Sequence, residues 1–131
     1  MKLSRLAGLA SIIGVFAAPA WAADAQSAGT DKVAFNNHCR TCHSDKAGDN
    51  RQGPSLGGIV GAKAGSQQGF PNYSQAMKSS GITWDEQTLD KFIANPEAVV
   101  PNNNMKPFAG VPDAAVRQKI IASLKASDAQ G

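Results

Sequence analysis

Both cysteines and both histidines of the chain lie within six consecutive residues, 38–43. Cys39 and Cys42 are three positions apart, and His43 follows directly. Residues three apart lie on neighbouring positions of one helical face, so two such thiols can add to the two vinyl groups on one side of a porphyrin. The imidazole that follows can then reach the iron. The pattern Cys-x-x-Cys-His is typical of covalent attachment of a c-type haem.

Three other chemistries use two closely spaced cysteines. A disulfide between Cys39 and Cys42 would close a very short loop and remove little entropy from the unfolded chain. A thiol redox centre needs a strand-to-helix junction, and no strand pattern precedes Cys39. A structural zinc site needs a second cluster of ligands, which the sequence lacks. His38 precedes the first thiol, and we expect it at the surface rather than on the iron.

An electron carrier closes the second axial position of its haem iron with a further ligand. Downstream of the motif the chain offers Met77 and Met105. Met105 lies in an irregular segment framed by prolines, where a loop can lay a thioether over the haem. Met77 lies in a short helical pattern, where packing is the ordinary role. We therefore expect His43 and Met105 as the axial ligands, and thioether ligation raises the reduction potential.

The sequence around these residues resembles the class I cytochromes c, in particular mitochondrial cytochrome c and the bacterial soluble cytochromes c of the c2 type. The segments that carry the resemblance are residues 53–58, 81–84, 95–96 and 105–110, and it extends from about residue 35 to residue 124. It implies an all-α fold, with about four or five helices and long loops wrapped around one haem c. It also implies an electron-transfer protein and not an enzyme.

The resemblance assigns roles around the haem as well. The carbonyl of Pro54 would accept a hydrogen bond from the Nδ1–H of His43, which orients the ring and strengthens it as a ligand. Tyr73 and Trp84 would hydrogen-bond the haem propionates. Phe108 would cover the haem edge.

The chain departs from the mitochondrial pattern at several positions. Phe92 stands where that family has a tyrosine whose hydroxyl lies near the methionine sulfur. Ala62 stands in the place of a propionate-binding arginine, with Lys63 beside it. Asp31 and Ser123 replace a glycine and an aromatic residue where the terminal helices cross. These changes affect the potential and local detail more than the family.

The N-terminal segment has the features of a secretory signal peptide. Lys2 and Arg5 precede an apolar run over residues 6–18, and small residues follow at the positions that a signal peptidase recognises. The run is shorter than the roughly 20 apolar residues of a membrane-spanning helix. We expect cleavage of residues 1–22 after Ala22, export to the periplasm, and a cytochrome c domain over residues 23–131.

Cleavage changes the charge of the protein. The full chain has 13 Lys and Arg against 10 Asp and Glu, a net charge of +3. Loss of the leader leaves 11 against 10, and two haem propionates would bring the total to about −1. The mature chain is therefore no strong polycation, and its composition gives no support to nucleic-acid binding.

Helical patterns divide the rest of the chain. Residues 24–30 are polar and expected to fray, and residues 44–63 are expected to form a long loop. Helices are expected over 31–42, over 74–80 with a stop at Gly81, from a capping box at 83–86 to 95–96, and from 112–113 onward. The residues expected to face inward are Val33, Ala34, Phe35, Leu89, Phe92, Ile93, Val116, Ile120, Ile121 and Leu124.

These features favour a monomeric periplasmic carrier of single electrons, for example in a respiratory chain. Its partners would be a membrane cytochrome complex, a terminal oxidase or reductase, or a periplasmic dehydrogenase, docking briefly at the haem edge. Stable membrane insertion is not expected. Four basic residues could surround that edge: Arg40, Lys46, Lys63 and Lys106. The alternative is a five-coordinate, ligand-binding or peroxidase-like haem protein, which requires Met105 to be off the iron.

Overall fold

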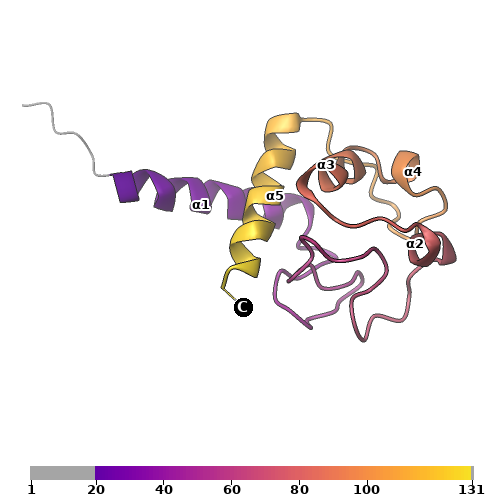
Figure 1. Ribbon diagram of the computed structural model, residues 1–131. Coiled ribbons are helices and arrows are strands. Elements are labelled where there is room, and N and C mark those ends of the chain that lie inside the picture. Colours follow the sequence, from indigo (N-terminus) through magenta and orange to yellow (C-terminus); the bar gives the residue numbers. More distant parts are fainter. Residues whose placement is uncertain (1–19, 131) are drawn as a thin grey trace, which may run out of the picture.

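The computed structural model describes residues 20–130, with side chains from residue 25 onward, and residues 1–19 of the expected signal peptide lie outside the described residues. The described chain forms five helices, which are α1 (Ala20–His38), α2 (Gln75–Ser79), α3 (Glu86–Ala94), α4 (Pro96–Val99) and α5 (Ala114–Asp128) (Figure 1). Between residues 20 and 130 the only β-pairing is an isolated bridge from Lys63 to Thr83. The expected all-α class, with four or five helices and long loops, is confirmed.

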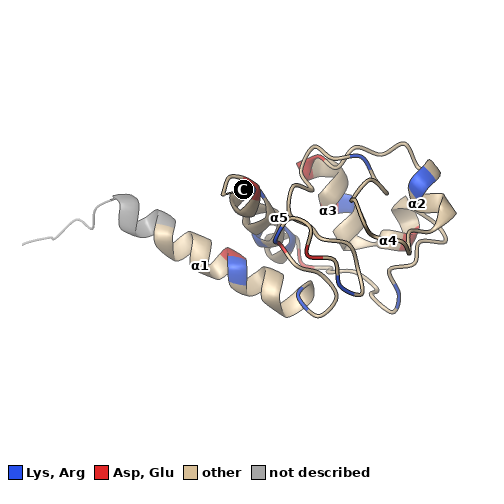
Figure 2. Cartoon of the chain, turned by 90° about the horizontal axis from the view of Figure 1, so that it is seen from below, with Lys and Arg blue, Asp and Glu red and all other residues tan. Residues whose placement is uncertain are grey.

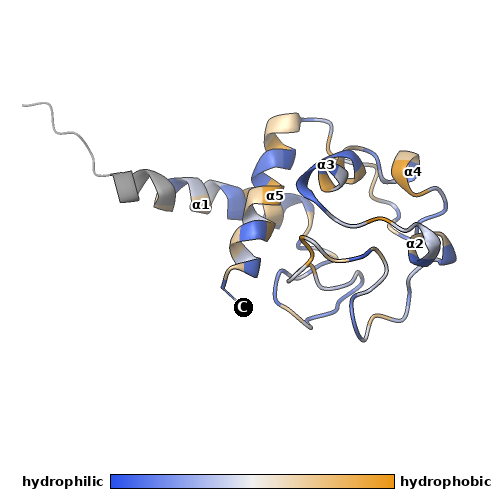
Figure 3. Cartoon of the chain, viewed as in Figure 1, coloured by the Kyte–Doolittle hydropathy of each residue, from blue (hydrophilic) through white to orange (hydrophobic). Residues whose placement is uncertain are grey.

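The two terminal helices cross and form one half of the core (Figure 1). On α1, Phe35 is 1% exposed, and on α5 Ile120, Ile121 and Leu124 are all buried, so hydrophobic residues meet at the crossing (Figure 3). The prediction that Val33 faces inward is wrong, because its side chain is 56% exposed. Residues two apart on a helix point about 200° away from each other, so burial of Phe35 turns Val33 outward.

The start and end of α1 also differ from the predicted range of 31–42. The helix begins at Ala20, and residues 25–30 are helical and almost entirely exposed, where fraying was expected. The alanines at positions 20, 22, 23, 25 and 28 favour this extension of the helix, because alanine has the highest helix propensity. This end of α1 projects away from the body of the molecule (Figure 1), and the expected cleavage site after Ala22 falls inside it.

The short helix α2 begins and ends where the sequence predicts. Ser74 caps it by accepting a hydrogen bond from the backbone N–H of Met77, and Gly81 follows with a positive φ of 69°. Met77 is buried on this helix. It therefore packs in the core, as expected for this methionine.

The capping box of α3 lies two residues later than predicted. Asp85 is the N-cap, and its side chain and that of Thr88 bond each other's backbone N–H groups. Thr83 does not cap, because its backbone pairs with Lys63 in the isolated bridge. The apolar stripe of Leu89, Phe92 and Ile93 is buried as expected.

Pro96 ends α3 and also begins the short helix α4, which the sequence analysis did not anticipate. The side chain of Asn95 caps α4 by accepting from the N–H of Ala98 at 3.2 Å. Proline is well suited to the first helical position, since its missing N–H would have no partner there. The last helix begins after Asp113, as predicted.

Candidate functional site

The residues of the Cys-x-x-Cys-His motif form one tight turn at the end of α1. The N–H of Cys39 donates to the carbonyl of Phe35 at 2.8 Å, and the N–H of His43 donates to the carbonyl of Cys39 at 2.9 Å. Both cysteines are free thiols. The two thiols and the imidazole therefore belong to a single turn that continues the helix, which is the arrangement that the spacing predicts.

His43 is buried, with 6% of its surface exposed. Its Nδ1 donates to the carbonyl oxygen of Pro54 at 2.7 Å, so the hydrogen bond expected from the resemblance is present. Burial lowers the pKa of His43, and the bond to Pro54 opposes that change. The imidazole is thus held neutral and oriented, and its other nitrogen, Nε2, keeps the lone pair that a metal ligand requires.

Gly53 lies directly against the His43 ring. A Cβ atom at residue 53 would stand 2.3 Å from Cε1 and 2.6 Å from Nδ1 of that ring. The backbone fixes this approach, because the N–H of Gly53 donates to the carbonyl of Cys42 at 2.7 Å and that of Leu56 donates to Ser44 at 2.7 Å. The sequence placed Gly53 in the expected loop over residues 44–63 and did not indicate this contact, because a contact between positions ten apart leaves no local signal.

The thiols do not resemble those of a redox-active cysteine pair. Burial of Cys39 raises its pKa to about 12, and the neighbouring Cys42 adds to the rise. Thiol oxidoreductases instead lower the pKa of their attacking cysteine. Among residues 20–130 no group of three or more His, Cys, Asp or Glu side chains is placed to hold a metal ion.

Aromatic residues line the hydrophobic core beside the motif. Trp84 and Phe92 are buried, with ring centroids 4.9 Å apart and planes tilted by 58°. Tyr73 is partly buried and packs edge-on against Phe70 at 4.9 Å. Burial raises the pKa of Tyr73. Trp84 is held in place by its backbone N–H, which donates to the carbonyl of Ala62 at 2.9 Å.

Met105 and Phe108 lie on the loop between α4 and α5. Both are partly buried and pack against the core to which Trp84 and Phe92 belong, as Cys39 and Tyr73 also do. The N–H of Met105 donates to the side-chain Oδ1 of Asn103 at 2.9 Å. The structure thus brings the predicted site residues from four separate segments to one core.

These residues fit a covalently attached haem. The turn supplies two thiols and a buried neutral imidazole, and the apolar core against which Cys39 packs also has the Met105 thioether packed on it from a loop. Trp84 is buried in this core and Tyr73 packs against it, and their side chains carry N–H and O–H donors of the kind that a propionate accepts. Cys39 and Cys42 would hold the haem covalently, with His43 and Met105 at the iron.

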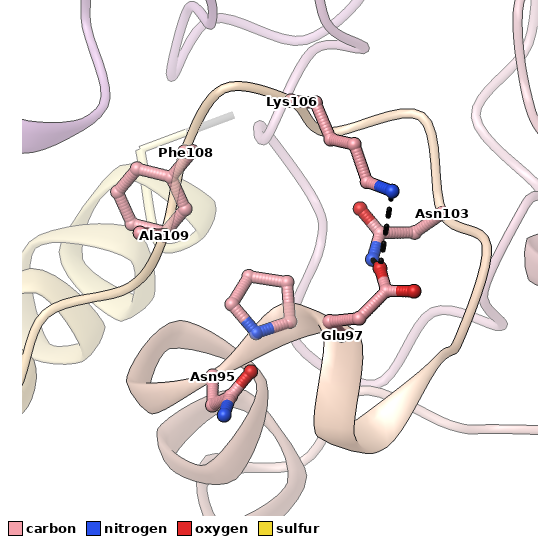
Figure 4. A pocket seen from close by; sticks show the side chains of 7 residues that line it. Asn95, Glu97, Asn103, Lys106, Phe108 and Ala109 are labelled. Carbon is pink, nitrogen blue, oxygen red and sulfur yellow. Dashed lines mark hydrogen bonds and ion pairs between the residues drawn. The ribbon is translucent and has the colours of Figure 1, made fainter.

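A small pocket lies beside the Met105 loop (Figure 4). Its volume is about 90 Å³, well below the roughly 300 Å³ of ordinary ligand pockets. Its lining comes from the end of α3, from α4 and from the loop, and comprises Asn95, Pro96, Glu97, Asn103, Lys106, Phe108 and Ala109. The pocket is too small for a haem, and it marks where α4 faces the loop.

The known proteins to which this chain is similar are named cytochrome c2 or cytochrome c. Cytochrome c2 of Rhodomicrobium vannielii is 44% identical over 122 residues, which is 88% of this chain and 94% of the relative. Cytochrome c2 iso-2 of Magnetospirillum fulvum is 48% identical over 87 residues, covering 66% of this chain and 88% of the relative.

A solved structure gives the same result in three dimensions. Cytochrome cH from Methylobacterium extorquens superposes with a TM-score of 0.68 at 40% identity, over 76% of this chain and 97% of that structure. No protein-family model matches the chain. The similarity therefore includes both sequence and fold, and it extends over most of the described residues.

Proposed function

Because the chain belongs to the class I cytochromes c, electron-transfer proteins with one covalently bound haem c, we propose that it is a periplasmic electron carrier with His43 and Met105 as axial ligands. The observation that carries the ligation is the buried His43 ring, held through Nδ1 on the Pro54 carbonyl, together with a methionine on an irregular loop that packs on the same core.

The bound haem supplies one-electron chemistry, and the protein controls its environment. Thioether bonds from Cys39 and Cys42 fix its position. The Pro54 carbonyl makes His43 a more basic ligand, and the Met105 thioether raises the potential. Apolar residues such as Phe92 exclude water from the site. Tyr73 and Trp84 would hydrogen-bond the propionates, and Phe108 would cover the edge.

The partners we propose are redox proteins that dock briefly at the haem edge: a membrane cytochrome complex, a terminal oxidase or reductase, or a periplasmic dehydrogenase. Arg40, Lys46 and Lys63 are exposed and available for docking, whereas Lys106 pairs with Glu97 at 3.7 Å. Positive and negative residues are interspersed over the described part of the chain (Figure 2), so we expect modest electrostatic steering. Electron-transfer rates should then fall only moderately with rising salt.

We further propose that the protein reaches the periplasm after removal of residues 1–22. No helix within residues 20–130 is long and apolar enough to cross a membrane. The expected mature protein begins at Ala23, functions as a monomer and carries one haem. The mass of the secreted protein tests the cleavage site and the haem content at once, because it should equal the chain 23–131 plus one haem.

The test of the ligation compares two matched substitutions, Met105→Leu and Met77→Leu. Leucine keeps the volume of methionine but cannot ligate iron. Met105→Leu should abolish the methionine–iron absorption band of the ferric protein and lower the reduction potential, within the roughly 0.8 V range that axial ligands span. Met77→Leu should keep both, because Met77 is a buried core residue of α2.

The alternative, a five-coordinate ligand-binding or peroxidase-like protein, predicts a different result. In that case the ferric wild type shows no methionine–iron band, and Met105→Leu changes neither spectrum nor potential. Relatives named cytochrome c2 and cytochrome c do not favour this alternative.

A further inference from the structure

The loop that carries Met105 has little main-chain support. Within the described residues, no backbone-to-backbone hydrogen bond involves residues 104–110, although Asn103 and Val111 on either side each make one. The loop therefore depends on side chains for its position. Asn104 holds one point by donating to the carbonyl of Asn72 at 3.0 Å.

The principal support comes from Asn103, which is 3% exposed. Its Oδ1 accepts from the N–H of Met105 at 2.9 Å, and its Nδ2 donates to the carbonyl of Val100 at 2.9 Å. The same Nδ2 also donates to Oε2 of Glu97 at 3.0 Å. The amide of Asn103 thus links the backbone of Met105 to the carboxylate of Glu97 on α4.

Glu97 contacts the loop at two further points. Its Oε1 accepts from the N–H of Asn102 at 2.9 Å, and its Oε2 lies 3.7 Å from Nζ of Lys106 (Figure 4). Asn102 has a φ of +62°, a conformation that is unfavourable for residues other than glycine and least so for asparagine. A carboxylate bond to that N–H stabilises this turn. We call Glu97, Asn102, Asn103 and Lys106 the Glu97 cluster.

We infer that Glu97 is a positioning residue for Met105, and that the Glu97 cluster determines how readily an external ligand displaces this methionine from the haem iron. The inference rests on the proposed ligation by Met105. Glu97 acts through Asn103, whose Nδ2 donates to Glu97 and whose Oδ1 accepts from the N–H of Met105. Hydrogen bonds to a charged acceptor are stronger than neutral ones, so one carboxylate can hold a loop without backbone bonds.

The substitution Glu97→Gln isolates this role. Glutamine keeps one acceptor oxygen for the N–H of Asn102, but it places an NH2 group where Oε2 now accepts from Asn103 and Lys106. Two donors then face each other. Glu86→Gln is the matched control, because Glu86 is also half-exposed and pairs with a lysine, Lys125, far from the loop.

The experiment uses the ferric holoprotein at neutral pH and titrates it with imidazole, which competes with methionine for the iron. Glu97→Gln should increase the apparent affinity for imidazole about fivefold, the effect of losing one ordinary hydrogen bond, since the Glu97 carboxylate is half-exposed. Glu86→Gln should match the wild type. Denaturant unfolding of both variants, followed by circular dichroism, should remain close to the wild type.

Lys106→Ala tests the ion pair of the Glu97 cluster separately from its hydrogen bonds. It removes the exposed ion pair and leaves the bond from Asn103 to Glu97, so its imidazole affinity should stay within about twofold of the wild type. Equal imidazole affinity in Glu97→Gln and wild type would overturn the inference. So would an equal gain in Glu86→Gln, which would point to net charge as the cause.

Failure of the proposed ligation gives a different result. If Met105 is not the ligand, the wild-type ferric protein lacks the methionine–iron band before any imidazole is added. The inference fails alone when that band is present in all variants and Glu97→Gln shows no gain in affinity.

Discussion

The two expected axial ligands are held by different kinds of contact. His43 belongs to a turn whose main chain is bonded on both sides, to Phe35 through Cys39 and to the segment that carries Gly53. Met105 lies within residues 104–110, for which the described part of the chain shows no backbone-to-backbone hydrogen bond, and the side chain of Asn103 supports it. The histidine ring is 6% exposed, whereas the methionine is only partly buried.

This difference indicates which ligand can leave. Main-chain bonds on the histidine side form with the fold, so loss of His43 from the iron requires local unfolding. Side-chain bonds on the methionine side can break while the helices remain folded. We therefore expect ligand exchange at Met105 well before any change at His43, and substitutions can test that order.

The largest loss of stability is expected for Gly53→Ala. Its new Cβ would stand 2.3 Å from Cε1 of His43, and the ring cannot retreat while Nδ1 is bonded to Pro54. Overpacking of this kind costs about 3 kcal/mol, so the unfolding free energy of the holoprotein should fall by that amount. Denaturant titration measures it.

Gly29→Ala is the control for that substitution. A Cβ at residue 29 meets no atom within 4 Å, and the position is helical, so alanine should be neutral or slightly stabilising. Equal stability of Gly53→Ala and Gly29→Ala would show that the histidine side can adapt. The contrast between the two ligands would then be lost.

Asn103→Ala should lower the unfolding free energy less than Gly53→Ala does, but it should weaken the position of Met105 more. The substitution leaves the N–H of Met105 and the carbonyl of Val100 without their side-chain partners. Unpaired buried groups cost roughly 1–3 kcal/mol, so we expect about 2 kcal/mol less stability. Imidazole affinity of the ferric protein should rise at least tenfold, more than in Gly53→Ala. A higher imidazole affinity in Gly53→Ala than in Asn103→Ala would contradict the proposed difference between the two ligand regions.

The histidine side was largely predictable from the sequence, whereas on the methionine side Met105 and Phe108 were predicted but the side chains that support their loop were not. Cys39, Cys42 and His43 lie within five consecutive residues, so their spacing specifies one turn. Capping residues such as Asp113 indicate where helices begin. The family resemblance supplied Pro54, which lies eleven residues from its partner. Spacing alone would not have found it.

The Glu97 cluster shows why the rest was missed. The contact from Glu97 to Asn103 depends on the turn that α4 makes, and α4 itself was not predicted because Pro96 was interpreted only as a stop. The asparagines at 102–104 were a usable signal, since asparagine side chains readily bond nearby backbone. Their partners depend on φ and ψ values that the sequence does not specify.

The smallest effect is expected at Asp85, which caps α3 and lies outside both ligand regions. Hydrogen bonds from Thr88 hold the pKa of Asp85 below its usual value of 3.8. A carboxyl whose pKa is lower in the folded state stabilises the fold above that usual value, and the contribution disappears as the pH falls through the folded pKa.

Asp85→Asn tests this contribution, because asparagine caps a helix about as well as aspartate but carries no charge to interact with the helix dipole. The variant should therefore be slightly less stable than the wild type at neutral pH, and the difference should vanish as the pH falls below 3.8 and through the folded pKa of Asp85. Denaturant unfolding across this pH range measures it. Imidazole affinity should be unchanged, because α3 holds neither ligand by itself. A gain in imidazole affinity would mean that the start of α3 also positions the Met105 loop. Asp85 would then belong to the region that supports the methionine.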